Sequence, residues 1–180
     1  MTAKDCIKSR RSIRKFTDQP VAREVIEEII DTARFAPSWK NTQITRYTVV
    51  TDPGLKEKIA NECTTIFPMN ASRILSAPVL VCVSVIKARS GYERDGSFST
   101  HRGEGWQMFD AGVASQTFCL AAHEHGLGTV ILGLFDDDKV AAAIDLPENQ
   151  DLVALIPMGY PDESPEAPSR KSVEDLVRFL

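Results

Sequence analysis

The segment "WQMFDAGVASQTFCLAAHEHGLG", residues 106–128, constrains the fold of this chain more than any other. Its pattern is helical and apolar on most of its circumference, and its small residues allow neighbouring elements to approach closely. A helix of this kind must be buried, either in a large core or in an interface between subunits. Gly126 and Gly128 are expected to end it. The remaining sequence must therefore supply elements that cover a long central helix.

The flanking sequence alternates between helical and strand patterns. An amphipathic helix is expected over 23–36, where apolar residues recur at helical spacing and Pro37 follows. Other runs predict helices over 55–63 and 136–144, and strands over 46–51, 77–86, 129–135 and 151–160. The 77–86 run is apolar enough to be buried on both faces. We therefore expect an α+β fold with α/β layers, in one domain that spans residues 1–180.

Charge and hydropathy exclude several classes of protein. The formal net charge of −4 argues against a nucleic-acid-binding protein, which needs a basic face. The amino terminus lacks the apolar stretch of a signal peptide, and the run "PVLVCVSVI" is far shorter than the ~20 residues of a membrane span. The four cysteines are scattered, so reduced thiols in a cytoplasmic protein are expected, with Cys82 and Cys119 buried.

Several familiar catalytic patterns are absent from the sequence. It has no G-x-x-x-x-G-K-[ST] loop, no G-x-G-x-x-G turn after a strand, and no G-x-S-x-G elbow. His123 and His125 lie two positions apart on a helix, so they point to different faces and cannot share a metal ion. No metal site and no serine nucleophile are therefore expected.

Positive charge gathers at both ends of the chain instead. The stretch "SRRSIRKF" contains Arg10, Arg11 and Arg14, and Arg170 and Lys171 lie near the carboxyl end. Such residues can be solvated surface charge, can pair with neighbouring acids, or can face a compact anion such as phosphate. The planar fork of arginine suits a phosphate dianion well. Composition leaves open whether the two groups of cations meet.

The loop "APSWKNTQ" adds amide side chains between these two groups. Asn41 and Gln43 could read the hydrogen-bonding edge of a heterocycle, and Asn41 could equally cap a turn. Cations for a phosphate and amides for a ring together indicate a phosphorylated ring cofactor.

Four segments in this order resemble the nitroreductase family of FMN-dependent NAD(P)H oxidoreductases. "RRSIRKF" resembles its opening R-R-S-x-R-x-F, and "ARFAPSWKNTQ" resembles its A-P-S-x-x-N-x-Q loop. "FDAGVASQTFCLAAHEHGLGT" resembles its central helix with a G-L-G exit. "GYPDES", followed by "SRKSVEDLV", resembles its G-x-P segment and closing basic pair. The resemblance covers essentially the whole chain.

The resemblance implies a nitroreductase-like fold, with a mixed, mainly antiparallel sheet, flanking helices and a long buried central helix. It implies a homodimer with one bound FMN in each of two interface clefts. NADH or NADPH would deliver hydride to flavin N5, and a nitroaromatic, quinone or similar acceptor would then take its place in a ping-pong cycle. A specialised enzyme of this fold, such as a dehalogenase or dehydrogenase, and a non-catalytic flavin-binding protein are the alternatives.

The resemblance also assigns roles to residues. Arg10, Arg11 and Ser12 would hold the FMN phosphate together with Arg170 and Lys171. Arg14 would reach the ribityl and pyrimidine side, Asn70 would hydrogen-bond the ring, and Arg73 would lie near N1 and O2. The partner subunit would supply Pro37, Ser38, Trp39 and Asn41, while Ile131, Leu132 and Gly133 would lie along the isoalloxazine. No side chain is assigned as catalytic, because the flavin carries the chemistry.

Three features depart from the family pattern. Gln43 is followed by Ile44 and Thr45, where many members have Pro-Trp, so the path of this loop is uncertain from sequence. Trp39 is bulky for a position beside the flavin, where it would wall the cleft or stack on the ring. Gly133 stands where some relatives have an acidic residue, which leaves a backbone contact at N5. The polar segment 88–105, which has four glycines, is expected to be a mobile loop or a short lid. Its residues do not indicate a particular substrate.

Overall fold

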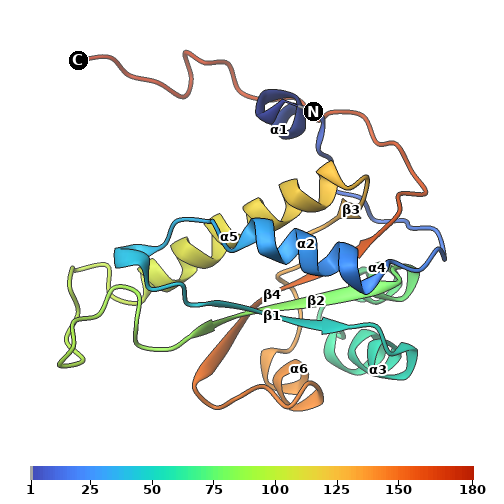
Figure 1. Ribbon diagram of the computed structural model, residues 1–180, viewed down its shortest axis with the longest axis horizontal. Coiled ribbons are helices and arrows are strands. Elements are labelled where there is room, and N and C mark those ends of the chain that lie inside the picture. The colour runs from blue at the N-terminus through green and yellow to red at the C-terminus, as the bar shows by residue number, and fades with distance from the viewer. Residues whose placement is uncertain (1) are drawn as a thin grey trace.

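The computed structural model describes residues 2–180, and Figure 1 shows their arrangement. The helices are α1 (Ala3–Ser9), α2 (Arg23–Ala33), α3 (Pro53–Cys63), α4 (Met69–Ser76), α5 (Gly105–Glu124) and α6 (Asp137–Ala143), with a 3₁₀ turn at Trp39–Asn41. The strands are β1 (Thr45–Val50), β2 (Val79–Ile86), β3 (Gly128–Thr129) and β4 (Gln150–Gly159). Within residues 2–180, no helix is both long and apolar enough to cross a membrane.

The four strands form one sheet in the order β1-β2-β4-β3. Every pair of neighbouring strands is antiparallel. A parallel bridge joins Ser12 to Thr129 at the β3 edge, so the amino-terminal segment runs beside the sheet. This arrangement confirms the expected mixed, mainly antiparallel sheet.

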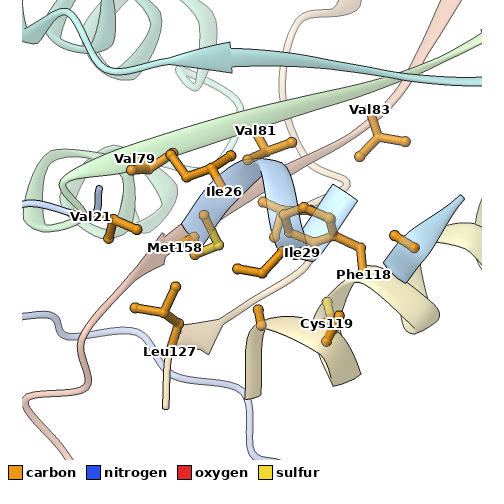
Figure 2. Packing of buried hydrophobic residues seen from close by; sticks show 14 of the residues in the cluster. Val21, Ile26, Ile29, Val79, Val81, Val83, Phe118, Cys119, Leu127 and Met158 are labelled. Atoms are coloured by element: carbon orange, nitrogen blue, oxygen red, sulfur yellow. The ribbon is translucent and has the colours of Figure 1, made fainter. Parts of the chain in front are cut away.

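Helices cover both faces of the sheet (Figure 1). Helices α2 and α5 pack on one face, and α3, α4 and α6 lie on the other. Strand β2 serves both layers because successive side chains point to opposite faces. Val79, Val81 and Val83 enter the core with α2 and α5, as Figure 2 shows, whereas Leu80 and Cys82 enter the other core. The prediction that this strand is buried on both faces is confirmed.

Local sequence explains where several helices begin and end. The Asp52 side chain accepts a hydrogen bond from the Leu55 N–H and so caps α3, whose first residue is Pro53. The Asp136 side chain caps α6 in the same way by accepting from the Lys139 N–H. After α5, Gly126 has a φ of 75°, a conformation that glycine adopts without the steric cost of a side chain.

The expected strand over 129–135 is mostly irregular backbone. Only Gly128 and Thr129 form β3, and beyond them Leu132 exchanges two backbone hydrogen bonds with Leu155 of β4. Contact with the sheet is therefore intermittent, and Ile131 and Gly133, on either side of Leu132, are exposed. Helices α1 and α4 were not expected from the sequence pattern.

The cysteines are free thiols, and Cys82 and Cys119 are buried as predicted. Burial raises the pKa of the Cys82 thiol to about 12, because the surrounding apolar core disfavours the thiolate. Neither thiol is therefore poised for nucleophilic chemistry.

Candidate cofactor site

A cavity of about 270 Å³ lies between the amino-terminal segment and the carboxyl-terminal tail. It is lined by Arg10, Arg11, Ser12, Arg14, Pro165, Glu166, Pro168 and Arg170. Cations from the two ends of the chain therefore meet at one place. Lys171 does not line this cavity, and its side chain is exposed.

Backbone contacts hold the wall of this arginine cavity in place. The Ile13 N–H donates to the Thr129 carbonyl at the sheet edge, at an N···O distance of 3.0 Å. On the other side, the Arg14 N–H donates to the Glu163 carboxylate, and the Asp162 N–H donates to the Lys15 carbonyl at 3.0 Å. The segment 12–16 is thus fastened between β3 and the start of the tail.

Three of the arginines that line the cavity, Arg11, Arg14 and Arg170, donate from their guanidinium groups to backbone carbonyl oxygens. Arg11 donates to the Lys8 carbonyl at 2.7 Å and to the Arg10 carbonyl at 2.9 Å, and Arg170 donates to the Pro168 carbonyl at 3.2 Å. In residues 2–180, none of the guanidinium groups of the four arginines around the cavity lies within 4.0 Å of an Asp or Glu carboxylate oxygen; Glu163 contacts Arg14 only through the Arg14 backbone N–H.

The donor set of the cavity fits a phosphate group. Four arginines and Ser12 line it, and Glu166 is the one acidic residue among its lining residues. An anion bound there would find several donors whose charge is not already neutralised by an ion pair. The cavity can therefore hold the phosphate of a mononucleotide.

His123 lies close enough to the cavity to be affected by the positive charges of its arginines. The Ser9 hydroxyl and His123 Nε2 lie 2.8 Å apart, which links α1 to the end of α5. Burial and the positive charges of Arg10 and Arg11 lower the pKa of His123. His123 was not among the residues that the sequence pointed to, because its position depends on how α1 packs against α5.

Helix α4 carries one further candidate arginine, Arg73, which contacts Asn70. Asn70 is buried, its Nδ2 donates to the Leu134 carbonyl at 2.9 Å, and its Oδ1 accepts from Arg73 at 2.8 Å. Arg73 also lies over the Phe67 ring, 5.6 Å from its centroid. Both functional groups of Asn70 therefore have protein partners, and its clearest action is to orient Arg73 and the backbone at Leu134.

The segment after β3 presents backbone to the solvent. The Leu132 side chain is buried in the core, whereas Ile131 is 47% exposed. A Cβ added at Gly133 would meet no atom within 4 Å, and within residues 2–180 the Gly133 N–H donates no hydrogen bond. A ring lying here would meet the backbone of Leu132 and Gly133 and the side chain of Ile131.

The loop that contains Pro37, Ser38, Trp39 and Asn41 lies elsewhere. It follows the far end of α2, at the opposite end of the molecule from α4 (Figure 1). The Trp39 ring packs against Trp106 of α5, with 4.5 Å between ring centroids, and the Trp39 backbone N–H donates to the carboxylate of Asp110. The structure thus does not bring these loop residues to the arginine cavity of the same chain. Asp110 was not among the candidate residues from the sequence, although an acidic residue in an otherwise apolar helix indicates a buried polar contact.

Comparison with known proteins identifies the family of the chain. The nitroreductase family model matches residues 7–160. An FMN reductase [NAD(P)H] of Bacillus subtilis is 31% identical over 168 residues, with 88% of this chain and 66% of the relative covered. An iodotyrosine deiodinase of Nematostella vectensis is 27% identical over 195 residues, with 95% of this chain and 72% of the relative covered.

Solved structures agree as well. A crystal structure of a nitroreductase family protein from Clostridium novyi NT superposes with a TM-score of 0.78 at 31% identity, over 93% of this chain and 89% of the other. The fold expected from the sequence is therefore confirmed. Both the matched length and the shared architecture lead to the same conclusion, that this chain belongs to the nitroreductase family.

Proposed function

We propose that this chain is an FMN-dependent NAD(P)H oxidoreductase, in which residues 1–180 form one FMN-binding domain. The observation that carries the proposal is the cavity where Arg10, Arg11, Arg14 and Arg170 meet without ion-pair partners among residues 2–180. Family membership and the similarity to an FMN reductase [NAD(P)H] support the same cofactor and co-substrate.

The residues around the cavity would divide the work of holding FMN. Arg10, Arg11, Ser12 and Arg170 would bind the phosphate, and exposed Lys171 would add a longer-range attraction. Arg14 and Arg73 would face the ribityl and pyrimidine side, where Arg73, held by Asn70, would offset negative charge. When bound, FMN supplies hydride transfer from NAD(P)H to an acceptor in a ping-pong cycle, and the Gly133 N–H is available as a donor to its ring.

We propose further that the active form is a homodimer. On α5, Met108 and Phe109 are 50% and 61% exposed, an unusual position for large apolar residues on a central helix. Ile131 and Leu134 add exposed apolar surface next to the candidate ring site. A second copy of the chain that covers α5 would bury this surface, and it would offer its own Pro37–Asn41 loop to the cleft.

The proposed acceptor is a nitroaromatic compound, a quinone or a similar two-electron acceptor. The similarity to an iodotyrosine deiodinase favours one second candidate, reductive dehalogenation of a halogenated aromatic. Both reactions would use the same cofactor and the same arginine cavity, so they differ only in what lies over the open face of the ring.

The test is spectroscopic. We expect the purified protein to be yellow, its flavin absorbance to bleach under anaerobic conditions with NADH or NADPH, and the colour to return with menadione or a nitrofuran. Bound flavin that neither nucleotide reduces would contradict the oxidoreductase and favour a flavin-binding protein. Return of colour with an iodinated phenol, but with neither of the other acceptors, would favour the dehalogenase.

A further inference from the structure

The loop 37–43 between α2 and β1 has a strained backbone. Lys40, Asn41 and Gln43 have φ values of 45°, 54° and 48°, in the left-handed region that residues other than glycine rarely adopt. Each such residue costs free energy, and the conformation persists only where the surroundings enforce it. Something outside the loop must therefore hold it in shape.

Asp110 on α5 is the buried contact that does so. Asp110 is 3% exposed, and both of its carboxylate oxygens accept from the Trp39 backbone N–H, at 3.1 and 3.0 Å. Trp39 immediately precedes the first left-handed residue, so this hydrogen bond fixes the backbone where the strain begins. No Lys, Arg or His nitrogen of residues 2–180 lies within 4.0 Å of the Asp110 carboxylate.

The Trp39 ring also packs against Trp106 of the same helix, with 4.5 Å between ring centroids, and the remaining polar contacts of the loop are weaker constraints. The Ser38 hydroxyl accepts from the Gln43 N–H at 2.9 Å, which closes the loop on itself without tying it to the core. Lys40 pairs with Glu93 at 2.8 Å, but both side chains are about half exposed, and such surface pairs contribute little. Asp110 is thus the charged group that connects the loop to the buried helix.

The loop also holds polar atoms that the chain does not satisfy. Trp39 Nε1 and Thr42 Oγ1 are buried and have no hydrogen-bond partner within residues 2–180. Buried polar groups are nearly always paired, so this loop is held in a shape that needs a further surface to complete it. Strain and unpaired atoms in one short loop are typical of a functional site rather than a simple connection.

We propose that Asp110 is a positioning residue for cofactor binding. Through the Trp39 backbone N–H it holds the 37–43 loop in one conformation, and the loop in that conformation faces the cofactor cleft of a second copy. Asp110 itself touches the loop and not the cofactor. The inference rests on the proposed function, because the loop is offered to FMN only in the homodimer. The alternative is that Asp110 merely stabilises the fold.

The first experiment tests the loop without any flavin. Trypsin cleaves after lysine, so the rate of cleavage after Lys40, mapped by mass spectrometry on flavin-free protein, reports how tightly the loop is held. Losing a buried hydrogen-bond partner corresponds to a factor of roughly 5 to 150, so we expect Asp110→Ala to speed this cleavage about tenfold or more. Asp110→Asn keeps an acceptor oxygen and should stay near the wild-type rate. Cleavage after Lys171 in the tail is the internal control.

The second experiment links the loop to the cofactor. FMN affinity, measured by quenching of flavin fluorescence, should fall about tenfold in Asp110→Ala and recover in Asp110→Asn. In the Asp110→Ala background, Lys40→Gly should restore part of the affinity, because glycine adopts a positive φ without strain. Lys40→Ala is the matched control, since it loses the same ion pair and keeps the Cβ.

The outcomes of the two experiments distinguish failure of the positioning role of Asp110 from failure of the proposed FMN-dependent function. If wild-type protein binds no FMN but Asp110→Ala still exposes Lys40, the loop anchor stands and the proposed function fails. If cleavage after Lys40 is unchanged in Asp110→Ala, or if the wild type binds FMN but Lys40→Gly and Lys40→Ala restore its affinity equally, the positioning role is wrong. Asp110→Leu fills the same space without an acceptor and replaces Asp110→Ala if that variant does not fold. Failure of both to fold, while Asp110→Asn folds, would assign Asp110 to the fold alone.

Discussion

The arginine cavity and the 37–43 loop are built in opposite ways. The cavity is assembled from both ends of one chain, and the side chains of Arg11, Arg14 and Arg170 donate to nearby carbonyl oxygens. The loop is strained at three residues and buries two polar atoms without partners among residues 2–180. In the proposed site, one chain would therefore supply the anion-binding half by itself, whereas the other half would need the loop of a second copy. A site divided in this way should respond differently to changes in its two halves.

The largest effect should come from separating the halves. We expect Phe109→Glu to convert the proposed dimer into monomers, because a carboxylate at this exposed position of α5 would be buried against the second copy. Interface hot spots change the dissociation constant by about thirtyfold or more. Analytical ultracentrifugation measures the dimer, and bound flavin should fall with it. Asn61→Glu, at an exposed neutral residue of α3, is a control for the added charge, and a Phe109→Glu variant that stays dimeric would contradict the proposed interface.

A smaller effect should come from the anion half alone. Removing one charged donor from a phosphate corresponds to about a 10- to 100-fold loss of affinity, which we expect for Arg10→Ala. Riboflavin has no phosphate, so its weaker binding should be unchanged by this substitution. Arg23→Ala removes an exposed arginine that pairs with Glu27 and should leave FMN affinity intact. Lys171→Ala should have a lesser effect than Arg10→Ala, because Lys171 lies off the cavity.

Substitutions at two glycines, one packed against the cavity wall and one in open space, should change the stability of the protein by different amounts. A Cβ at Gly128 would lie 2.6 to 2.9 Å from atoms of Ile13, which stands between Ser12 and Arg14. We therefore expect Gly128→Ala to destabilise the protein by about 1–3 kcal/mol and to disturb the cavity wall. Gly133→Ala meets open space and should change stability by less than about 0.5 kcal/mol. Chemical denaturation of both variants checks this, and equal stabilities would count against the packing described here.

The smallest effect is a dependence on pH. The pKa of His123 is lowered by burial and by Arg10 and Arg11, so the folded protein disfavours the charged imidazole. This group contributes no penalty above its unfolded pKa, and stability is lost as the pH falls below that value. Melting temperatures at pH 5 and pH 7.5 should therefore differ less in His123→Gln than in the wild type. An unchanged difference would assign the acid sensitivity to other groups.

Much of the architecture could be predicted from hydrophobic patterns. The 77–86 run was apolar on both faces and is a strand between two helical layers. The amphipathic stripe of 23–36 became α2, which ends at Ala33, shortly before Pro37. The four motifs were enough to identify the family, because their order and separation are properties of the sequence itself.

Other features depend on contacts that no local pattern records. The left-handed residues of the 37–43 loop carry no glycine to signal them, and the group that holds the loop is 71 positions away in the sequence. Lys56 is buried, and its Nζ donates to the carbonyls of Ala77 and Pro78, so a residue that usually marks a surface instead fastens α3 to the end of α4. That cations from both ends share one cavity also depends on tertiary structure, and the binding of FMN there stays a prediction.

The bridge between Ser12 and Thr129 has a consequence for solubility. Strand β3 is short and forms one border of the sheet, and an unpaired border can recruit strands from other molecules. The amino-terminal segment occupies that border, and the Ile13 N–H takes the Thr129 carbonyl that an incoming strand would seek. The same few residues that form a wall of the anion cavity therefore also protect the molecule against aggregation through this edge.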